Sequence, residues 1–101
     1  MADLFQARLR FRAERDLLRL NFIRTDLKLC LTLAGIAETK FQMGNLKHAE
    51  RILVRVEKSH SDMLRSFSQA KGMTAEVQSE LKSKFKQVRE RLDELRRIEQ
   101  S

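Results

Sequence analysis

The sequence predicts an all-α protein, an antiparallel bundle of three to four helices in a single domain over residues 1–101. Two observations of composition favour helices: the chain has no proline and only three glycines, and strong helix formers fill most of it. A third observation is the pattern, because apolar residues recur at three- and four-residue spacing and the pattern stops at Gly44 and Gly72. A chain of this length suits one domain.

The first stretch, residues 2–24, admits two interpretations. Its apolar residues follow a helical spacing: Leu4, Ala7, Phe11 and Leu18. Alternation of Arg8, Arg10 and Arg12 with apolar neighbours also suits an exposed strand. No other segment offers a strand to pair with, and a lone strand is not stable, so we predict a helix. Residues 21–25 contain neither glycine nor proline, which leaves open whether this helix continues into the next one.

Residues 26–43 are predicted to form a helix with a wide apolar arc. One face carries Leu27, Cys30, Ala34, Ala37 and Phe41, and a neighbouring face carries Leu29, Leu33, Ile36 and Met43. So wide an arc predicts burial on two sides, as in a helix packed between two others. Gly35 costs about 1 kcal/mol in a helix interior relative to alanine, and we attribute its presence to close approach of a neighbouring helix.

A tight turn is predicted at Gly44 and Asn45, the point around which the chain is organised. Glycine adopts the left-handed conformation that ends helices without penalty, and asparagine is a good N-cap for the helix that follows. Ala49 is small enough to let the two antiparallel helices touch. The third predicted helix covers residues 46–70, with one apolar row: Leu46, Ala49, Leu53, Val56, His60, Met63 and Phe67.

The last predicted helix covers residues 75–99. Gly72 is expected to repeat the role of Gly44, and Thr74 is a candidate N-cap. The apolar row of this helix consists of Val77, Leu81, Phe85, Val88, Leu92 and Leu95.

The central hairpin, residues 33–56, resembles a single tetratricopeptide repeat and also the hairpin of the microtubule-interacting and trafficking domain. The resemblance is carried by Leu33, Ile36, Ala37, Gly44, Leu46, Ala49, Leu53 and Val56. It departs from the repeat at Lys40, where an aromatic residue is usual, and at Ser61, where proline is frequent. The resemblance implies a scaffold that binds protein partners.

A net charge of +7 raises the alternative of nucleic-acid binding. A basic stripe recurs every three or four residues along the third predicted helix: Lys47, Arg51, Arg55, Lys58 and Arg65. Such a stripe can contact the phosphates of a nucleic acid without sequence specificity, or it can be a solvated face that Glu50 and Glu57 moderate. A looser basic cluster, Arg8, Arg10, Arg12, Arg15 and Arg19, is expected to spread around its helix.

No residue pattern indicates catalysis, a cofactor or a metal centre. Cys30 lies between leucines and is interpreted as a buried small side chain rather than a nucleophile. His60 falls in an apolar row and His48 does not, so the two do not form a ligand set. The single cysteine and the lack of a long apolar run predict a cytoplasmic protein without a membrane span. We therefore expect a small protein–protein interaction module that binds a protein partner or itself, and not an enzyme.

Overall fold

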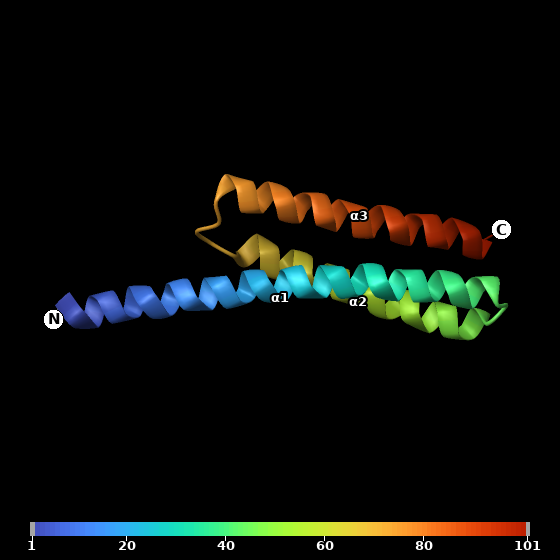
Figure 1. Cartoon of the computed structure of the whole chain (residues 1–101), viewed down its shortest axis with the longest axis horizontal. Helices are drawn as coiled ribbons and strands as arrows, with labels where there is room; N and C mark the ends of the chain where they lie inside the picture. Colours follow the sequence, from blue (N-terminus) through green and yellow to red (C-terminus); the bar gives the residue numbers. More distant parts are fainter. Residues whose placement is uncertain (1, 101) are drawn as a thin grey trace.

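The computed structural model describes residues 2–100, which contain three helices joined by two short connections. The helices are α1 (Ala2–Gln42), α2 (Leu46–Gln69) and α3 (Ala75–Gln100). Consecutive helices run antiparallel in an elongated bundle, so α1 and α3 run in the same direction (Figure 1). α1 is continuous through residues 21–25, so of the two alternatives for residues 2–43 the structure has the single helix. No helix within residues 2–100 is long and apolar enough to cross a membrane.

The core lies between one face of each helix. From α1 the buried residues are Ile23, Leu27, Cys30, Ala34 and Ala37. α2 contributes Ala49, Ile52, Leu53, Val56, His60 and Met63, and α3 contributes Leu81, Phe85, Val88, Leu92 and Leu95. These are largely the rows that helical spacing predicts. Of the predicted row members, Leu46 is exposed and Phe41, Phe67 and Val77 are half-buried, whereas Ile23 and Ile52 are buried in addition.

The turn between α1 and α2 is closed by backbone hydrogen bonds alone. Gly44 has a φ of 79°, its N–H donates to the Phe41 carbonyl at 3.0 Å, and the Asn45 N–H donates to the Lys40 carbonyl at 2.9 Å. These two bonds define the helix ending that glycine favours. The expected side-chain cap is wrong, because Asn45 makes no capping hydrogen bond and its ψ of 71° falls short of the extended value of a capping residue. Ala49 is fully buried, as expected.

The connection between α2 and α3 is a longer loop than the tight turn expected at Gly72. α2 ends at Gln69, and Ala70 is already extended (φ −71°, ψ 137°). Gly72 has a positive φ of 77° but lies in the loop rather than at the helix end. Thr74 is an N-cap as predicted, since its Oγ1 accepts a hydrogen bond from the Val77 N–H at 3.2 Å.

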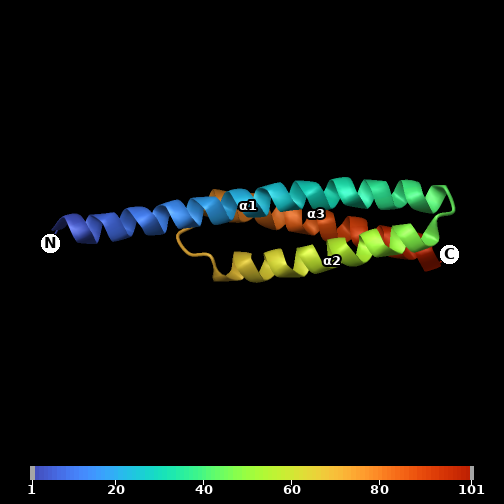
Figure 2. The same cartoon turned by 90° about the horizontal axis from the view of Figure 1, so that it is seen from below.

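α1 is much longer than the helices it packs against and projects past them at its N-terminal end (Figures 1 and 2). The α2–α3 loop reaches α1 near Asp16, because a Cβ placed on Gly72 would lie 3.9 Å from Asp16 Oδ2. No side chain of residues 3–22 is buried. We call residues 2–15 the overhang.

One of the two predicted apolar faces of α1 is buried, and of the other face only Leu33 is half-buried against the core. Leu29, Ile36 and Met43 are 51%, 42% and 67% exposed, because α2 and α3 both pack on the side of Leu27 and Ala34. The expectation of burial on two sides is therefore wrong. The explanation of Gly35 by close approach is wrong too, since a Cβ placed there would meet nothing within 4 Å.

Candidate functional site

The predicted basic stripe lies on the outer face of α2. Its five residues are all exposed: Lys47, Arg51, Arg55, Lys58 and Arg65. None of them forms an ion pair within residues 2–100. They share one side of α2 because steps of four, four, three and seven residues return to nearly the same angle on a helix of 3.6 residues per turn. The structure therefore brings the predicted residues together.

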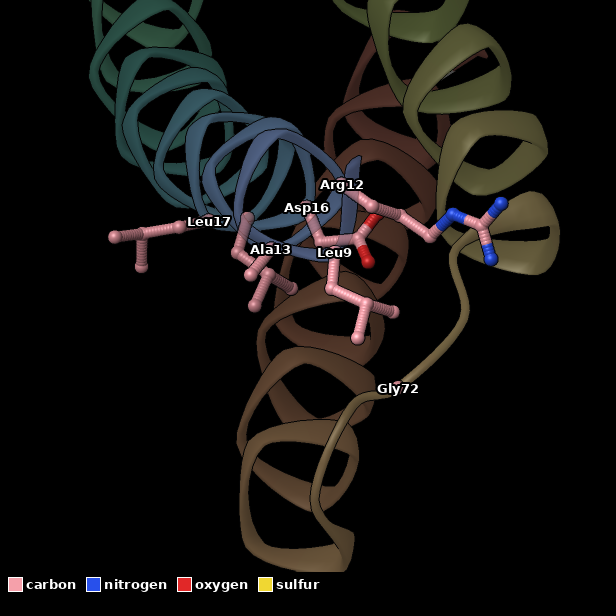
Figure 3. Close-up of a pocket in the computed structure, with 7 residues that line it drawn as sticks. Leu9, Arg12, Ala13, Asp16, Leu17 and Gly72 are labelled. Atoms are coloured by element: carbon pink, nitrogen blue, oxygen red, sulfur yellow. The ribbon is translucent and has the colours of Figure 1, made fainter. Parts of the chain in front are cut away.

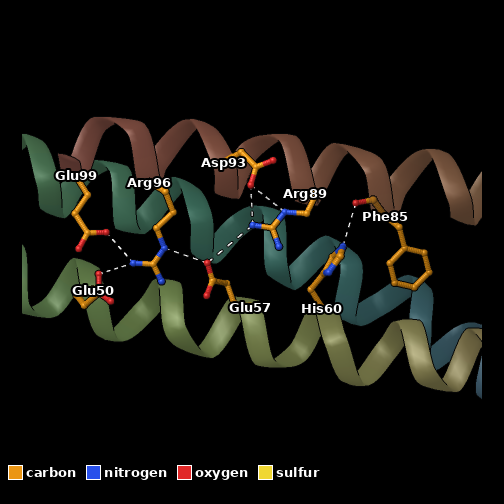
Figure 4. Close-up of polar contacts among 8 residues, drawn as sticks. All are labelled: Glu50, Glu57, His60, Phe85, Arg89, Asp93, Arg96 and Glu99. Carbon is orange, nitrogen blue, oxygen red and sulfur yellow. Dashed lines mark hydrogen bonds and ion pairs between the residues drawn. The ribbon is translucent and has the colours of Figure 1, made fainter. Parts of the chain in front are cut away.

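The two acidic residues expected to moderate this stripe face α3 instead (Figure 4). Arg96 of α3 donates to Glu57 at 3.0 Å and to Glu50 and Glu99 at 2.7 Å each. Arg89 Nη2 lies 4.0 Å from Glu57 Oε1. The hydrogen bond from Arg96, followed by the contact with Glu99, holds the pKa of Glu50 below its usual value. The hydrogen bonds to Glu57, Glu50 and Glu99 raise the pKa of Arg96. The basic stripe is consequently left without neighbouring carboxylates on its own helix, except for Asp62.

The arginines of the first stretch form a second basic surface. Arg8, Arg12, Arg15 and Arg19 follow steps of four, three and four residues and share one side of α1, so the expectation that the cluster spreads around its helix holds only for Arg10. These arginines likewise form no ion pair among residues 2–100.

A shallow basin of about 270 Å³ lies where this arginine surface meets the end of α2. It is lined by Arg12, Arg15, Asp16, Arg19, Gln69 and Lys71. Beside it, Leu9, Ala13 and Gly72 line a second, more apolar hollow, into which Leu9 points while Arg12 reaches toward the end of α2 (Figure 3). Asp16 faces both hollows, so the basin is basic without being free of negative charge.

Cys30 and His60 are core residues, as predicted. Cys30 is 2% exposed, and burial, with the nearby Asp26 carboxylate, raises the pKa of its thiol to about 11. Such a thiol carries almost no thiolate near neutral pH and is a poor nucleophile. The His60 ring is buried, donates from Nε2 to the Phe85 carbonyl at 3.2 Å, and meets the Phe85 ring edge-on at 5.6 Å between centroids (Figure 4).

A long row of exposed residues runs along α1, and the sequence predicts only part of it. Along the outer side of α1 and the residue that follows it, exposed residues alternate at steps of four and three: Leu4, Arg8, Phe11, Arg15, Leu18, Phe22, Thr25, Leu29, Thr32, Ile36, Thr39 and Met43. We call these twelve residues the heptad face. A four-three alternation is the spacing with which helices pair in coiled coils.

From Leu18 to Met43 the heptad face carries no charged side chain. Two of its threonines bond to their own helix: Thr32 Oγ1 donates to the Lys28 carbonyl and Thr39 Oγ1 to the Gly35 carbonyl, both at 3.2 Å. Because these hydroxyl donors are satisfied, their methyl groups can be covered without leaving an unpaired donor.

The seven large apolar side chains of the heptad face are between 42% and 69% exposed. Side chains of this size and exposure offer on the order of 800 Å² of surface, which is what each partner contributes to a standard protein interface. Monomeric proteins rarely expose a contiguous apolar strip of that extent without a role in binding.

The signal that identifies this face in the sequence is the unbroken alternation from Leu18 to Met43. The expected segments 2–24 and 26–43 separate Leu18 and Phe22 from the apolar face that holds Leu29, Ile36 and Met43. Searches of protein-family models, curated proteins and solved structures find no match to this chain.

Proposed function

We propose that the protein is a protein–protein interaction module that binds a partner helix along the heptad face of α1. The observation that supports this most directly is the exposed four-three alternation of apolar and threonine residues from Leu18 to Met43. A helix laid against such a face buries a row of anchors on one side of each partner. The proposal assigns binding rather than catalysis to the chain.

In this proposal the tetratricopeptide-like hairpin has a packing role. Ala37, Ala49, Leu53 and Val56 are buried between α1 and α2, whereas Ile36 and Leu46 are exposed. We propose that the hairpin is a rigid support for α1, and that binding uses the outer side of α1 rather than a groove between helices. A cytoplasmic location fits the single, free and buried cysteine.

Photo-crosslinking in the cells that make the protein tests this function. A photoreactive phenylalanine analogue at Leu29 should give a discrete crosslinked polypeptide. The same analogue at Val54, an equally exposed apolar residue on α2 (52% against 51%), is the matched control. Adding Ile36→Glu to the Leu29 probe should remove the adduct, because a carboxylate would then be buried in the interface. Equal yields from Leu29 and Val54 would refute the proposal.

Non-specific nucleic-acid binding is the second candidate, and the unpaired basic stripe of α2 supports it. Five exposed cations on one helix face can each replace a counterion on the phosphate backbone. Affinity should fall about linearly with salt on a logarithmic scale, and replacing Arg51 and Arg55 with glutamine should lower the slope by roughly two ions. An unchanged slope in this variant, or no shift of DNA or RNA at low salt, would exclude the stripe as a binding surface.

A further inference from the structure

We propose that the partner of the heptad face is a second copy of this chain, aligned antiparallel in the register that places Leu4 opposite the second copy's Met43. This inference rests on the proposed function and adds the identity of the partner and its orientation. It follows from aligning the twelve residues of the heptad face with the same twelve residues in reverse order.

In this register the large apolar residues face one another. Leu4 meets Met43, Phe11 meets Ile36 and Leu18 meets Leu29, each pair occurring twice because the dimer is symmetric. Phe22 meets Thr25 at the centre, so a large side chain lies against a small one on both sides of the two-fold axis. Antiparallel coiled coils pack alternate heptad positions against each other in this way, and all seven large apolar side chains of each copy are covered.

The two arginines of the heptad face distinguish the antiparallel from the parallel arrangement. In a parallel pair each residue faces its own copy, so Arg8 would lie against Arg8 and Arg15 against Arg15. In the antiparallel register Arg15 faces Thr32 and Arg8 faces Thr39. The threonine side chain is short, which leaves the guanidinium free to extend toward solvent while its aliphatic part covers the threonine methyl group.

Charges beside the heptad face select the register. With Leu4 opposite Met43, Arg19 of each copy flanks Asp26 of the other, giving two pairs of opposite charge. Sliding the helices by one heptad in one direction would bring the two Asp26 carboxylates together. Sliding them the other way would bring the two Arg19 guanidinium groups together. Like charges across an interface disfavour the wrong register, so the register that buries most apolar surface is also the one that pairs Arg19 with Asp26.

The rest of the fold leaves room for this pairing. Both α2 and α3 pack on the core face of α1, and every residue of the heptad face is exposed along the whole helix. With roughly 800 Å² contributed by each copy, the interface reaches the standard size of a specific complex. The overhang, whose side chains from residue 3 onward are not buried in one copy, would lie against the C-terminal half of the second copy's α1.

Light scattering at high micromolar concentration tests the pairing. The expected mass is twice the 11.9 kDa of one chain. Leu29→Glu should weaken the dimer by roughly 100-fold, because each dimer would bury two carboxylates. Val54→Glu introduces the same charge at an equally exposed site on α2 and should leave the mass at the dimer value. Neither substitution touches the core, so helix content by circular dichroism should stay at the parent value.

Thiol crosslinking tests the register. Differently tagged Leu18→Cys and Leu29→Cys chains, when mixed, should crosslink to each other through a short bis-maleimide, and neither should crosslink to itself. A mixture of Leu18→Cys and Ile36→Cys is the control for a shift of one heptad and should give little product. The native Cys30 is 2% exposed and does not compete.

Two results would overturn the inference. One is a dimer that crosslinks Leu18 with Leu18 or Leu18 with Ile36. The other is a monomer by light scattering, and in that case photo-crosslinking from Leu29 to a different polypeptide would leave the proposed function standing. A monomer without any such adduct would refute both.

Discussion

Changing Gly44 and Gly35 to alanine, one at a time, should have opposite effects on stability. At Gly44 the backbone has a φ of 79°, and an L-residue pays about 1–2 kcal/mol there. Alanine also restricts the unfolded chain more than glycine does, which stabilises the folded state by about 0.4–1 kcal/mol. The net cost of Gly44→Ala is therefore about 1 kcal/mol. At Gly35 the backbone is helical and a Cβ meets nothing within 4 Å, so Gly35→Ala should gain up to about 1 kcal/mol.

Thermal unfolding followed by circular dichroism measures this difference. For a domain of about 100 residues, 1 kcal/mol shifts the melting temperature by about 4–8 °C. Gly44→Ala should therefore melt several degrees below the parent chain and Gly35→Ala several degrees above it. Gly44→Val should melt lower still, since a β-branched residue fits positive φ less well. All chains are compared at one protein concentration, because association shifts the melting temperature.

A Gly44→Ala chain that melts at or above the parent temperature would refute the turn. The chain reversal would then not depend on a left-handed residue, and the hydrogen bonds from Gly44 and Asn45 to the end of α1 would not define the helix ending. A loss of stability in Gly35→Ala would instead show that a neighbouring backbone approaches α1 at that point.

Three further predictions concern single side chains. Thr74→Ala should lower the free energy of unfolding by about 1 kcal/mol in denaturant titrations, because it removes the N-cap of α3, whereas Asn45→Ala should cost less, because Asn45 has no capping bond. Hydrogen bonds from Arg24 hold the pKa of Glu80 below its usual 4.5. The stability from this pair is thus fully present above about pH 4.5 and lost as pH falls through the lowered pKa, and Glu80→Gln should reduce that part of the acid-induced fall in melting temperature. Cys30 should react with a thiol reagent at neutral pH only as fast as the chain opens, and faster reaction would show that it is not buried.

The helices α2 and α3 and their buried rows could be predicted because each has one apolar row and a glycine before or after it. Helical spacing alone places Leu53, Val56, Leu81 and Leu92 in the core. Gly44 could be predicted as a turn because few residues other than glycine adopt positive φ without cost.

The continuity of α1 could not be predicted from the sequence. The residues at positions 21–25 suit either a helix cap or a helix interior. Their local conformational preferences are weak compared with the effect of packing. The structure favours one helix because Ile23 and Leu27 bury their side chains on the same face, so a break between them would misalign the core.

The exposure of the second apolar face could not be predicted either. A wide apolar arc indicates that two surfaces of the helix are apolar. It does not indicate whether the second surface is covered by the same chain or by another one. Whether Leu29, Ile36 and Met43 are covered depends on where α2 and α3 pack against α1, which is a property of the whole bundle. The same holds for Glu50 and Glu57, whose positions beside the basic stripe are ambiguous until α3 is in place.

The elongated shape of the chain has a consequence for its behaviour in solution. The bundle measures 64 × 22 × 16 Å, so one copy experiences more friction than a sphere of its mass and would elute early from a sizing column. Side-by-side pairing along the whole of α1 would double the mass while adding little length. Sedimentation velocity should accordingly give a frictional ratio that decreases as the concentration rises, whereas copies joined end to end through their overhangs would give one that increases.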